Sequence, residues 1–363
     1  MNILFRVDSS SSMGIGHLSR CLALANCLVN SNHTVYFISR PLKGNRSDLV
    51  EANKIPTFFL PYIDINYNQN DYLSWLGTSQ KQDAVDTISV IKSNITSNID
   101  LLIVDHYALD HQWHKYLKPL ASKILVIDDL ANRKLLCDIV LDQTPGRKAI
   151  DYKLFTPQTT HFLCGSQFAL LRPEFSRVRK QSTQRRFDSP LSITIFLGGT
   201  DPDNVTSQII SSINLLSSNT ISDITLISAQ TPPNTLTKQL DESHHKSRVI
   251  VNSKNIAELY SNTDLVIGSG GVSALERCVV GAPSLQYIYA ENQESIADEL
   301  TSKGAAITIT TYRNPDFQHL PDLIRNLAKN NQLLQTMSDV ALTICDGNGI
   351  QRVVTNILSF LKC

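Results

Sequence analysis

The residues best suited to chemistry lie in a short loop near the start of the chain. Four serines, Ser9–Ser12, are followed by Gly14, Gly16 and His17. The loop joins an expected strand to a stretch with helical spacing, so it should end at a helix N-terminus. Two glycines allow backbone amides to approach an anion closely. His17 could accept a proton there, and helix capping by His17 is an equally supported alternative.

A second polar group directly follows the apolar run 101–104: Asp105, His106 and Tyr107. Parallel strands end at one edge of a sheet, so these side chains could enter the same crevice as His17. Asp105 could orient an imidazole, and Tyr107 could donate to a substrate oxygen. The plainer alternative is an Asp that caps the next helix beside a half-buried Tyr.

Three histidines in this region raise the question of a metal site. Of His106, His111 and His114, only the last two have a workable helical spacing, and no third ligand is evident. We therefore expect neither a metal nor a cofactor.

Glycine-rich turns recur in the second half of the chain. They comprise Gly198, Gly199, Thr200 and Asp201 in one case, and Ser269, Gly270 and Gly271 in the other. The first turn could hold a diphosphate at a helix N-terminus. Glu276 follows the second turn by about one helical turn, where its carboxylate could accept two ribose hydroxyls. An exposed glutamate in a first helical turn is the alternative.

Two amide side chains, Asn292 and Gln293, begin a further helical stretch after the run 284–287. Such amides can donate to phosphate or sugar oxygens. Helix capping by Asn292 is the competing interpretation.

Short apolar runs alternate with helical stretches throughout, as buried parallel strands do between helices. The runs are residues 3–7, 34–38, 57–60, 101–104, 124–127, 192–197, 224–227, 249–251, 265–267 and 284–287. We predict an α/β protein of two Rossmann-like doubly wound domains facing across a cleft. The predicted domains are 1–176 and 191–345, with a polar linker at 177–190 and a C-terminal helix at 346–363.

The bulk composition excludes several classes of function. The 363 residues exceed the size of most single cores, and Lys plus Arg equals Asp plus Glu at 33 each. That balance favours neither nucleic acid nor an anionic membrane. Scattered cysteines, an early charge and the lack of a long apolar run predict a soluble, cytoplasmic protein. The sequence does not decide the oligomeric state, and a monomer is one option.

The motifs together resemble one family, the UDP-2,4-diacetamido-2,4,6-trideoxy-β-L-altropyranose hydrolases of pseudaminic acid biosynthesis. The resemblance runs from residue 3 to about residue 310. It is carried by Arg6-x-Asp8, Gly14-x-Gly16-His17-x-x-Arg20, Asp105-His106-Tyr107, Leu171-Arg172-x-Glu174-Phe175, Gly198-Gly199-Thr200-Asp201 and Asn292-Gln293-Glu294-Ser295.

The resemblance implies a glycosyltransferase-B type fold, similar to the lipid II-forming N-acetylglucosaminyltransferase. It implies that the C-terminal domain binds UDP and that the N-terminal domain faces the sugar. Water then attacks the anomeric carbon with inversion and without a metal. The candidate catalytic residues are His17 as general base, Asp8 and Tyr107. The candidate substrate-binding residues are Gly14, Gly16, Asp105, Arg172, Gly199, Thr200, Asp201, Ser269, Gly270, Gly271, Glu276, Asn292 and Gln293.

Several alternatives stay open at this point. A structural ion pair with Glu174 is the alternative for Arg172. An inverting glycosyltransferase would use His17 to deprotonate an acceptor hydroxyl, and a non-catalytic protein would bind a UDP-sugar without turnover. The sugar's configuration rests on the resemblance alone. For the tail after about residue 310 we expect packing or dimerisation.

Overall fold

The protein divides into two compact units in a computed structural model that describes residues 1–64, 72–182, 187, 189–198, 201 and 204–362. The first unit comprises Met1–Leu171 and Asn348–Cys363, and the second comprises Arg172–Gly347. Within the described ranges, no helix is both long and apolar enough to cross a membrane.

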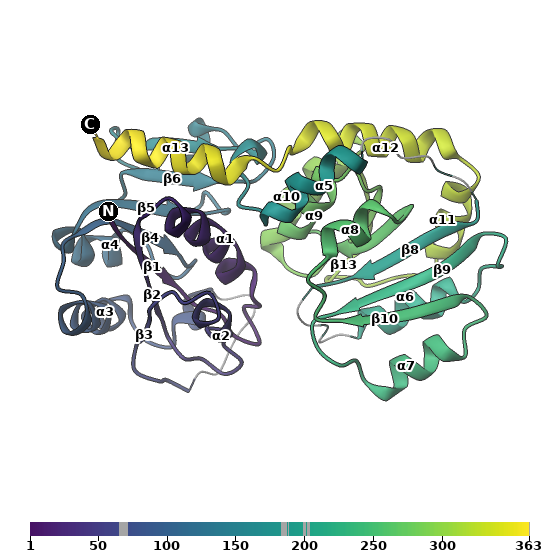
Figure 1. Cartoon of the computed structure of the whole chain (residues 1–363), viewed down its shortest axis with the longest axis horizontal. Coiled ribbons are helices and arrows are strands. Elements are labelled where there is room, and N and C mark those ends of the chain that lie inside the picture. The colour runs from purple at the N-terminus through teal and green to yellow at the C-terminus, as the bar shows by residue number, and fades with distance from the viewer. Residues whose placement is uncertain (65–71, 183–186, 188, 199–200, 202–203, 363) are drawn as a thin grey trace. The chain divides into compact units, whose positions relative to one another are not determined.

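The first unit is built on a parallel sheet of seven described strands in the order β3-β2-β1-β4-β5-β6-β7 (Figure 1). The strands are β1 (Asn2–Val7), β2 (Thr34–Ser39), β3 (Thr57–Phe59), β4 (Ile99–Asp105), β5 (Ala121–Ile127), β6 (Ile139–Asp142) and β7 (His161–Cys164). The order reverses between β1 and β4, where Val7 lies beside Asp105. In open α/β sheets, ligands bind beyond the carboxyl ends of strands at such a switch point.

The helices of the first unit include the C-terminal tail of the chain. They are α1 (Gly16–Asn30), α2 (Asp48–Glu51), α3 (Gln80–Asn94), α4 (His111–Leu117) and α13 (Gly349–Lys362), with short 3₁₀ turns η1 (Tyr72–Leu76), η2 (Lys118–Leu120), η3 (Ala149–Tyr152) and η4 (Ser166–Phe168). Helix α13, yellow in Figure 1, contacts α1. Its Val353 and Ile357 are buried in one cluster with Leu24 and Leu28. The tail therefore completes the core of the first unit.

The second unit repeats this plan with six described parallel strands in the order β10-β9-β8-β11-β12-β13. The strands are β8 (Leu191–Phe196), β9 (Ile221–Ser228), β10 (Lys246–Val251), β11 (Leu265–Ser269), β12 (Ser284–Ile288) and β13 (Ala306–Thr311). The helices are α5 (Pro173–Ser182), α6 (Val205–Ile213), α7 (Asn234–Asp241), α8 (Ile256–Ser261), α9 (Val272–Val279), α10 (Glu291–Lys303), α11 (Leu320–Ala328) and α12 (Asn331–Ile344). Both units thus confirm the predicted doubly wound α/β class.

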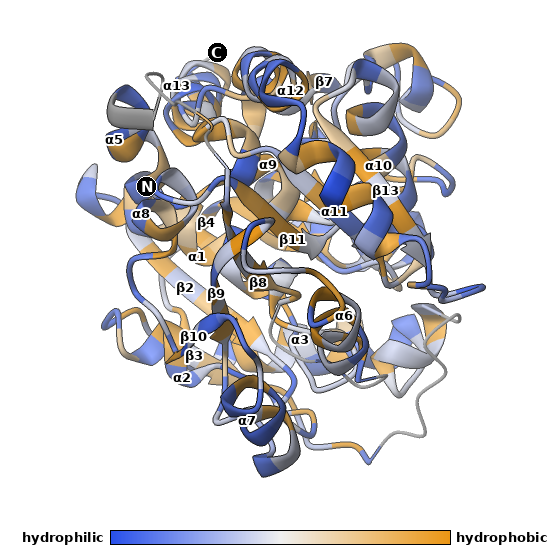
Figure 2. Cartoon of the chain, turned by 90° about the vertical axis from the view of Figure 1, so that its right-hand side faces the viewer, coloured by the Kyte–Doolittle hydropathy of each residue, from blue (hydrophilic) through white to orange (hydrophobic). Residues whose placement is uncertain are grey.

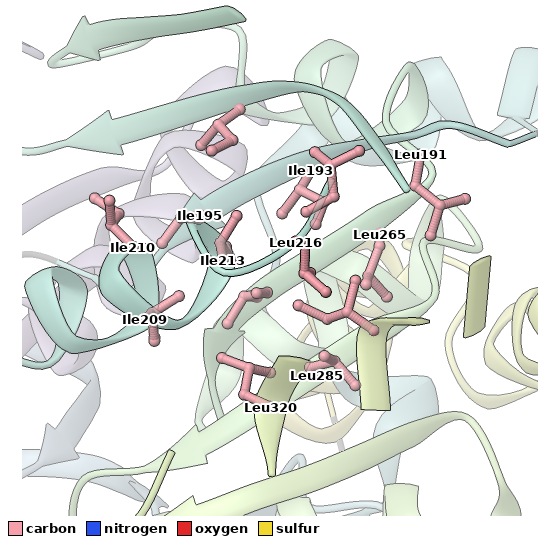
Figure 3. Close-up of a cluster of buried hydrophobic side chains, with 14 of the residues drawn as sticks. Leu191, Ile193, Ile195, Ile209, Ile210, Ile213, Leu216, Leu265, Leu285 and Leu320 are labelled. Carbon is pink, nitrogen blue, oxygen red and sulfur yellow. The ribbon is translucent and has the colours of Figure 1, made fainter. Parts of the chain in front are cut away.

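Branched aliphatic side chains hold the second unit together. Ile193 and Ile195 of β8 pack with Ile209 and Ile213 of α6 in one buried cluster (Figure 3). In Figure 2, β11 is also hydrophobic along its length, whereas the helices around it carry hydrophilic faces. Alternation along β8 explains the pattern, because successive side chains of a strand point to opposite faces.

The structure differs from the predicted boundaries in two places. The second unit begins at Arg172, and helix α5 covers part of the stretch 177–190 that was expected to be a linker. Phe175 is fully buried, with its ring 6.2 Å from that of Tyr260, so the hydrophobic contact extends the second unit backwards along the chain. Strands β6, β7 and β13 were not predicted, because their runs are short or rich in threonine.

Candidate active site

The serine and glycine loop between β1 and α1 is folded into a tight turn. The Ser10 hydroxyl accepts from the Met13 amide at 3.0 Å, and the Gly14 amide donates to the Ser10 carbonyl at 2.9 Å. Gly14 has φ +72°, a left-handed conformation that favours glycine. The turn delivers the chain to α1, whose N-cap is Ile15 and whose first turn contains no acidic side chain. The alternative of His17 as the helix cap is therefore wrong.

His17 instead forms a buried pair with Asp105. Its Nδ1 lies 2.6 Å from Asp105 Oδ1, and the His17 residue is 7% exposed. The pair follows from the topology, since His17 comes after β1 and Asp105 ends the neighbouring strand β4. Sequence reasoning anticipated that Asp105 could orient an imidazole, and the structure brings the two residues together.

Arg20 keeps the carboxylate of this pair ionised. It lies one turn after His17 on α1 and donates to both oxygens of Asp105, from Nε at 2.6 Å and from Nη2 at 2.7 Å. Although burial alone would raise it, the charge of Arg20 and the contact with His17 hold the pKa of Asp105 well below its usual range. An ionised Asp105 only accepts hydrogen bonds, so the proton of a neutral His17 lies on Nδ1. The lone pair is then on Nε2.

Aromatic rings enclose the imidazole. The His17 ring meets that of Tyr107 edge-on at 4.6 Å and that of Trp75 at 6.4 Å. The part of the chain that the structure describes places no hydrogen-bond partner on His17 Nε2. This nitrogen could therefore accept a proton from water.

Tyr107 has a different partner from the one predicted. Its hydroxyl donates to Asp129 Oδ2 at 2.8 Å, and Arg20 Nη1 donates to the same oxygen at 2.6 Å. A phenol has one proton, so in this arrangement it cannot also donate to a substrate oxygen. Asp129 thus joins Tyr107 to Arg20, and the Tyr107 ring lies against the His17 ring. Sequence reasoning missed Asp129, although it lies two residues after the apolar run 124–127, much as Asp105 follows 101–104.

Asp8 belongs to a separate buried cluster. Its Oδ1 accepts from Arg6 Nη1 at 2.5 Å and from the Arg40 amide at 2.7 Å, and its Oδ2 lies 3.3 Å from His106 Nε2. Burial would raise the pKa of Asp8, yet the charge of Arg6 holds it well below its usual range. Among the described residues, no hydrogen bond joins Asp8 to His17. Arg6 lies near the end of β1 and Asp8 directly follows the strand, two residues further along the chain, which places the two side chains close enough to pair.

The histidines considered for a metal are used in other ways. His106 faces Asp8, and buried His114 Nδ1 lies 3.2 Å from the Leu136 amide, which donates to it. His111 lies beside Asp110, the residue that caps α4. Within the described ranges, no group of three or more His, Cys, Asp or Glu side chains is arranged to hold a metal ion.

A further buried carboxyl at this sheet edge, that of Asp142, has a raised pKa. The Tyr152 hydroxyl lies 2.6 Å from Asp142 Oδ2 and 2.9 Å from Asp128 Oδ2. The single hydroxyl proton can be donated to only one of these oxygens at a time. Burial and the charge of Asp129 raise the pKa of Asp142 to about 7. Arg147 Nε lies 2.7 Å from Asp142 Oδ2 and opposes this rise, so Asp142 changes its protonation state near neutral pH.

The two glycine-rich segments of the second unit follow neighbouring strands. Gly198 follows β8 and Ser269 ends β11, and these strands are neighbours at the switch point of the sheet. Gly199 and Thr200 lie outside the described residues. Asp201 accepts from the Val205 amide at 2.8 Å and likewise from the next amide, so it caps α6 itself. Those two amides donate to Asp201, and a diphosphate at this helix end stays a prediction.

Glu276 is buried and bound by Arg172. Arg172 donates from Nε to Oε1 at 3.0 Å and from Nη2 to Oε2 at 3.2 Å, a bidentate pair. Arg172 Nη1 also lies 3.0 Å from Glu174, so the structural pair considered from the sequence is present as well. Burial works against it, but the charge of Glu276 raises the pKa of Arg172. Glu276 is therefore no exposed helix-turn glutamate, and its carboxylate keeps lone pairs for further donors.

The amide side chains of α10 lie close to the second glycine turn. Gln293 Oε1 accepts from the Tyr289 amide at 3.1 Å. A methyl group added at Gly271 would lie 3.5 Å from Gln293 Nε2, and one at Gly270 would lie 3.1 Å from Ala297 Cβ. Asn292 is the second residue of α10, whose N-cap is Ala290, so the capping alternative for Asn292 is wrong. Gly270 and Gly271 thus lie close to α10, Gly271 beside Gln293.

Comparison with known proteins adds the family. The chain is 30% identical over 305 residues to the UDP-2,4-diacetamido-2,4,6-trideoxy-β-L-altropyranose hydrolase of Campylobacter jejuni, covering 84% of this chain and 97% of that protein. The chain belongs to the family of this hydrolase. Residues 193–352 also match the glycosyltransferase family 28 C-terminal domain.

Solved structures share the fold of this hydrolase-family member. MurG of Acinetobacter baumannii superimposes with a TM-score of 0.71 at 16% identity, covering 99% of each chain. The spinosyn forosaminyltransferase SpnP gives 0.66 at 13% identity and covers 100% of each chain. The two doubly wound domains are therefore of the glycosyltransferase-B type, as the resemblance implied.

Proposed function

We propose that this protein hydrolyses UDP-2,4-diacetamido-2,4,6-trideoxy-β-L-altropyranose to UDP and the free sugar, in pseudaminic acid biosynthesis. The substrate class is supported by the 30% identity to the Campylobacter hydrolase along 97% of that protein's length. The single structural observation that supports the chemistry is the His17–Asp105 pair at 2.6 Å, beyond the switch point of the first unit. A base oriented by an ionised carboxylate suits the removal of a proton from water.

In this mechanism, water is the nucleophile and His17 is the general base. Nε2 takes a proton as the water oxygen bonds to the anomeric carbon, while the bond from that carbon to the UDP oxygen breaks. Asp105 stabilises the imidazolium that forms, and Arg20 and Asp129 hold Asp105 in place. A single displacement inverts the anomeric configuration, because no covalent intermediate restores it.

The second unit is proposed to bind the leaving UDP. Glu276 accepts the ribose hydroxyls with the lone pairs that Arg172 leaves free. Negative charge builds on the diphosphate as the bond breaks, and positive groups must stabilise it. Arg172 and the amides of the Ser269–Gly271 turn supply that stabilisation without a metal ion in this proposal.

The test supplies the purified UDP-sugar alone and measures UDP and free sugar. We expect one free sugar per UDP, and we expect His17→Ala to lose about 10²–10⁴-fold in kcat while it still binds UDP. His111→Ala, on the exposed side of α4, is the control and should keep wild-type turnover.

The alternatives give different results in the same assay. Turnover only after addition of a sugar or lipid acceptor would indicate a glycosyltransferase. Intact UDP-sugar recovered after long incubation would indicate a binding protein. Normal turnover in a folded His17→Ala protein would remove His17 from the mechanism.

A further inference from the structure

A buried positive charge lies beneath the second glycine turn. Arg277, on α9, is 0% exposed. Its neighbour in sequence, Glu276, uses both carboxylate oxygens for Arg172. In the described part of the chain, no carboxylate lies within ion-pair distance of Arg277. Its charge is therefore buried without a counterion.

The guanidinium of Arg277 contacts the turn from below. Nη2 donates to the Ser269 carbonyl at 2.8 Å, and Nη1 lies 3.4 Å from the Ser273 hydroxyl. Nη1 is also so close to the backbone that a methyl group at Gly268 would lie 2.6 Å from it. The cation thus contacts the end of β11, directly before the N-terminus of α9.

All the partners of this cation are neutral. They are a carbonyl, a serine hydroxyl and the nearby phenol of Tyr260, whose pKa is raised by burial. Burial lowers the pKa of Arg277, but guanidinium stays charged in proteins. Burying a charge without a paired carboxylate is costly.

The groups above Arg277 are suited to an anion. Gly271 is the N-cap of α9, no side chain caps the helix, and the first turn contains no acidic residue. The helix dipole and the buried guanidinium therefore add positive potential at the same place. The Ser269 and Ser273 hydroxyls, 3.0 Å apart, lie at this turn.

We propose that Arg277 is a positioning residue for the diphosphate of the nucleotide. Its charge attracts the phosphates through the Ser269–Ser273 turn, and its hydrogen bonds hold that turn in shape. This inference rests on the proposed function, in which the second unit binds UDP. It adds a residue that does not itself touch the substrate.

The test compares the affinities of UDP and uridine by calorimetry. Removing the charge in Arg277→Met should weaken UDP about tenfold or more and uridine less than about threefold, since only UDP carries phosphates. Arg277→Lys keeps the charge and should keep the wild-type ratio of the two affinities within about threefold. It also provides the test if the methionine variant does not fold.

A matched control is Arg179→Met on α5. Arg179 also lies in the second unit and donates to backbone carbonyls, those of Val279, Leu342 and Cys345. Its replacement should leave the ratio of the UDP and uridine affinities unchanged.

The outcomes separate this inference from the proposed function. Two results would overturn the role of the charge. One is an equal loss of affinity for UDP and for uridine in Arg277→Met, and the other is a ratio of the two affinities in Arg277→Lys that differs from wild type by more than about threefold. A wild-type protein that binds neither ligand would contradict the proposed function itself.

Discussion

Replacing Asp105 by asparagine should remove the negative charge that orients His17, the proposed base. Asp105 is fully buried and accepts from His17 at 2.6 Å and from Arg20 at 2.6 and 2.7 Å. The amide keeps the shape but loses the charge, and its NH₂ group can donate to His17 Nδ1. The proton of the neutral ring then moves to Nε2, which can no longer accept a proton from water.

The size of the effect follows from these contacts. A hydrogen bond to a charged group contributes about 1.5–3 kcal/mol, and each 1.36 kcal/mol is about tenfold in rate. Loss of the bond that stabilises the imidazolium alone predicts a fall of about 10-fold to 100-fold in kcat. The wrong tautomer adds to this, so we expect about 10²–10⁴-fold, the range of general-base catalysis.

Stability must be separated from catalysis in this experiment. Asp105→Asn also removes the carboxylate that pairs with the buried Arg20, so the melting temperature should fall. Asp83→Asn is the matched control, because Asp83 is equally buried and accepts from Arg6 at 2.8 Å and Arg40 at 2.7 Å. The control should lose stability while its kcat per folded molecule stays within about threefold of wild type.

The assay measures UDP release at saturating substrate, well below the melting temperature of each variant, with UDP affinity as the test of folding in the second unit. A folded Asp105→Asn protein with wild-type kcat would refute the assignment of the His17–Asp105 pair. So would an equal loss of kcat in Asp83→Asn, because the effect would then be one of stability.

Three further predictions concern binding, pH and metals. Glu276→Ala should weaken UDP binding with a smaller loss in kcat at saturation, because a ribose contact is similar in ground and transition states; unchanged UDP affinity would remove the ribose contact. The pKa of about 7 at Asp142 means that the folded state binds an extra proton between the unfolded value near 3.9 and about 7, so stability from this group is lost as pH rises through that window. Asp142→Asn should therefore reduce the decline in the unfolding free energy between pH 5 and 8 by at most about 3 kcal/mol. Denaturant titrations that give the same pH dependence of the unfolding free energy for both proteins would contradict this. Chelators should leave turnover intact, and activity lost in EDTA and restored by a divalent ion would contradict the metal-free mechanism.

The sequence predicted the part of the site that depends on strand ends. His17 and Asp105 are 88 positions apart, yet each follows an apolar run. Parallel strands end at one edge, so their meeting could be expected. Asp129 follows the same rule after β5 and was missed, because nothing in the sequence says which of the acids after strands turns toward α1.

Pairings that depend on helix packing could not be predicted. Arg172 meets Glu276 only because α5 packs against α9, and no local pattern records that contact. The start of the second unit was misplaced for the same reason, since buried Phe175 stands in a polar stretch. Tyr107 was expected to donate to substrate, and only the fold reveals Asp129 as its acceptor.

Hydrolysis in oxygen-18 water tests the central claim most directly. If His17 directs water to the anomeric carbon, mass spectrometry must find the label in the sugar and none in UDP, and early NMR spectra must show the inverted anomer first. Attack at phosphorus would instead place the label in the nucleotide or yield UMP and a sugar phosphate. Either of those products, or a first-formed anomer of retained configuration, would contradict the mechanism.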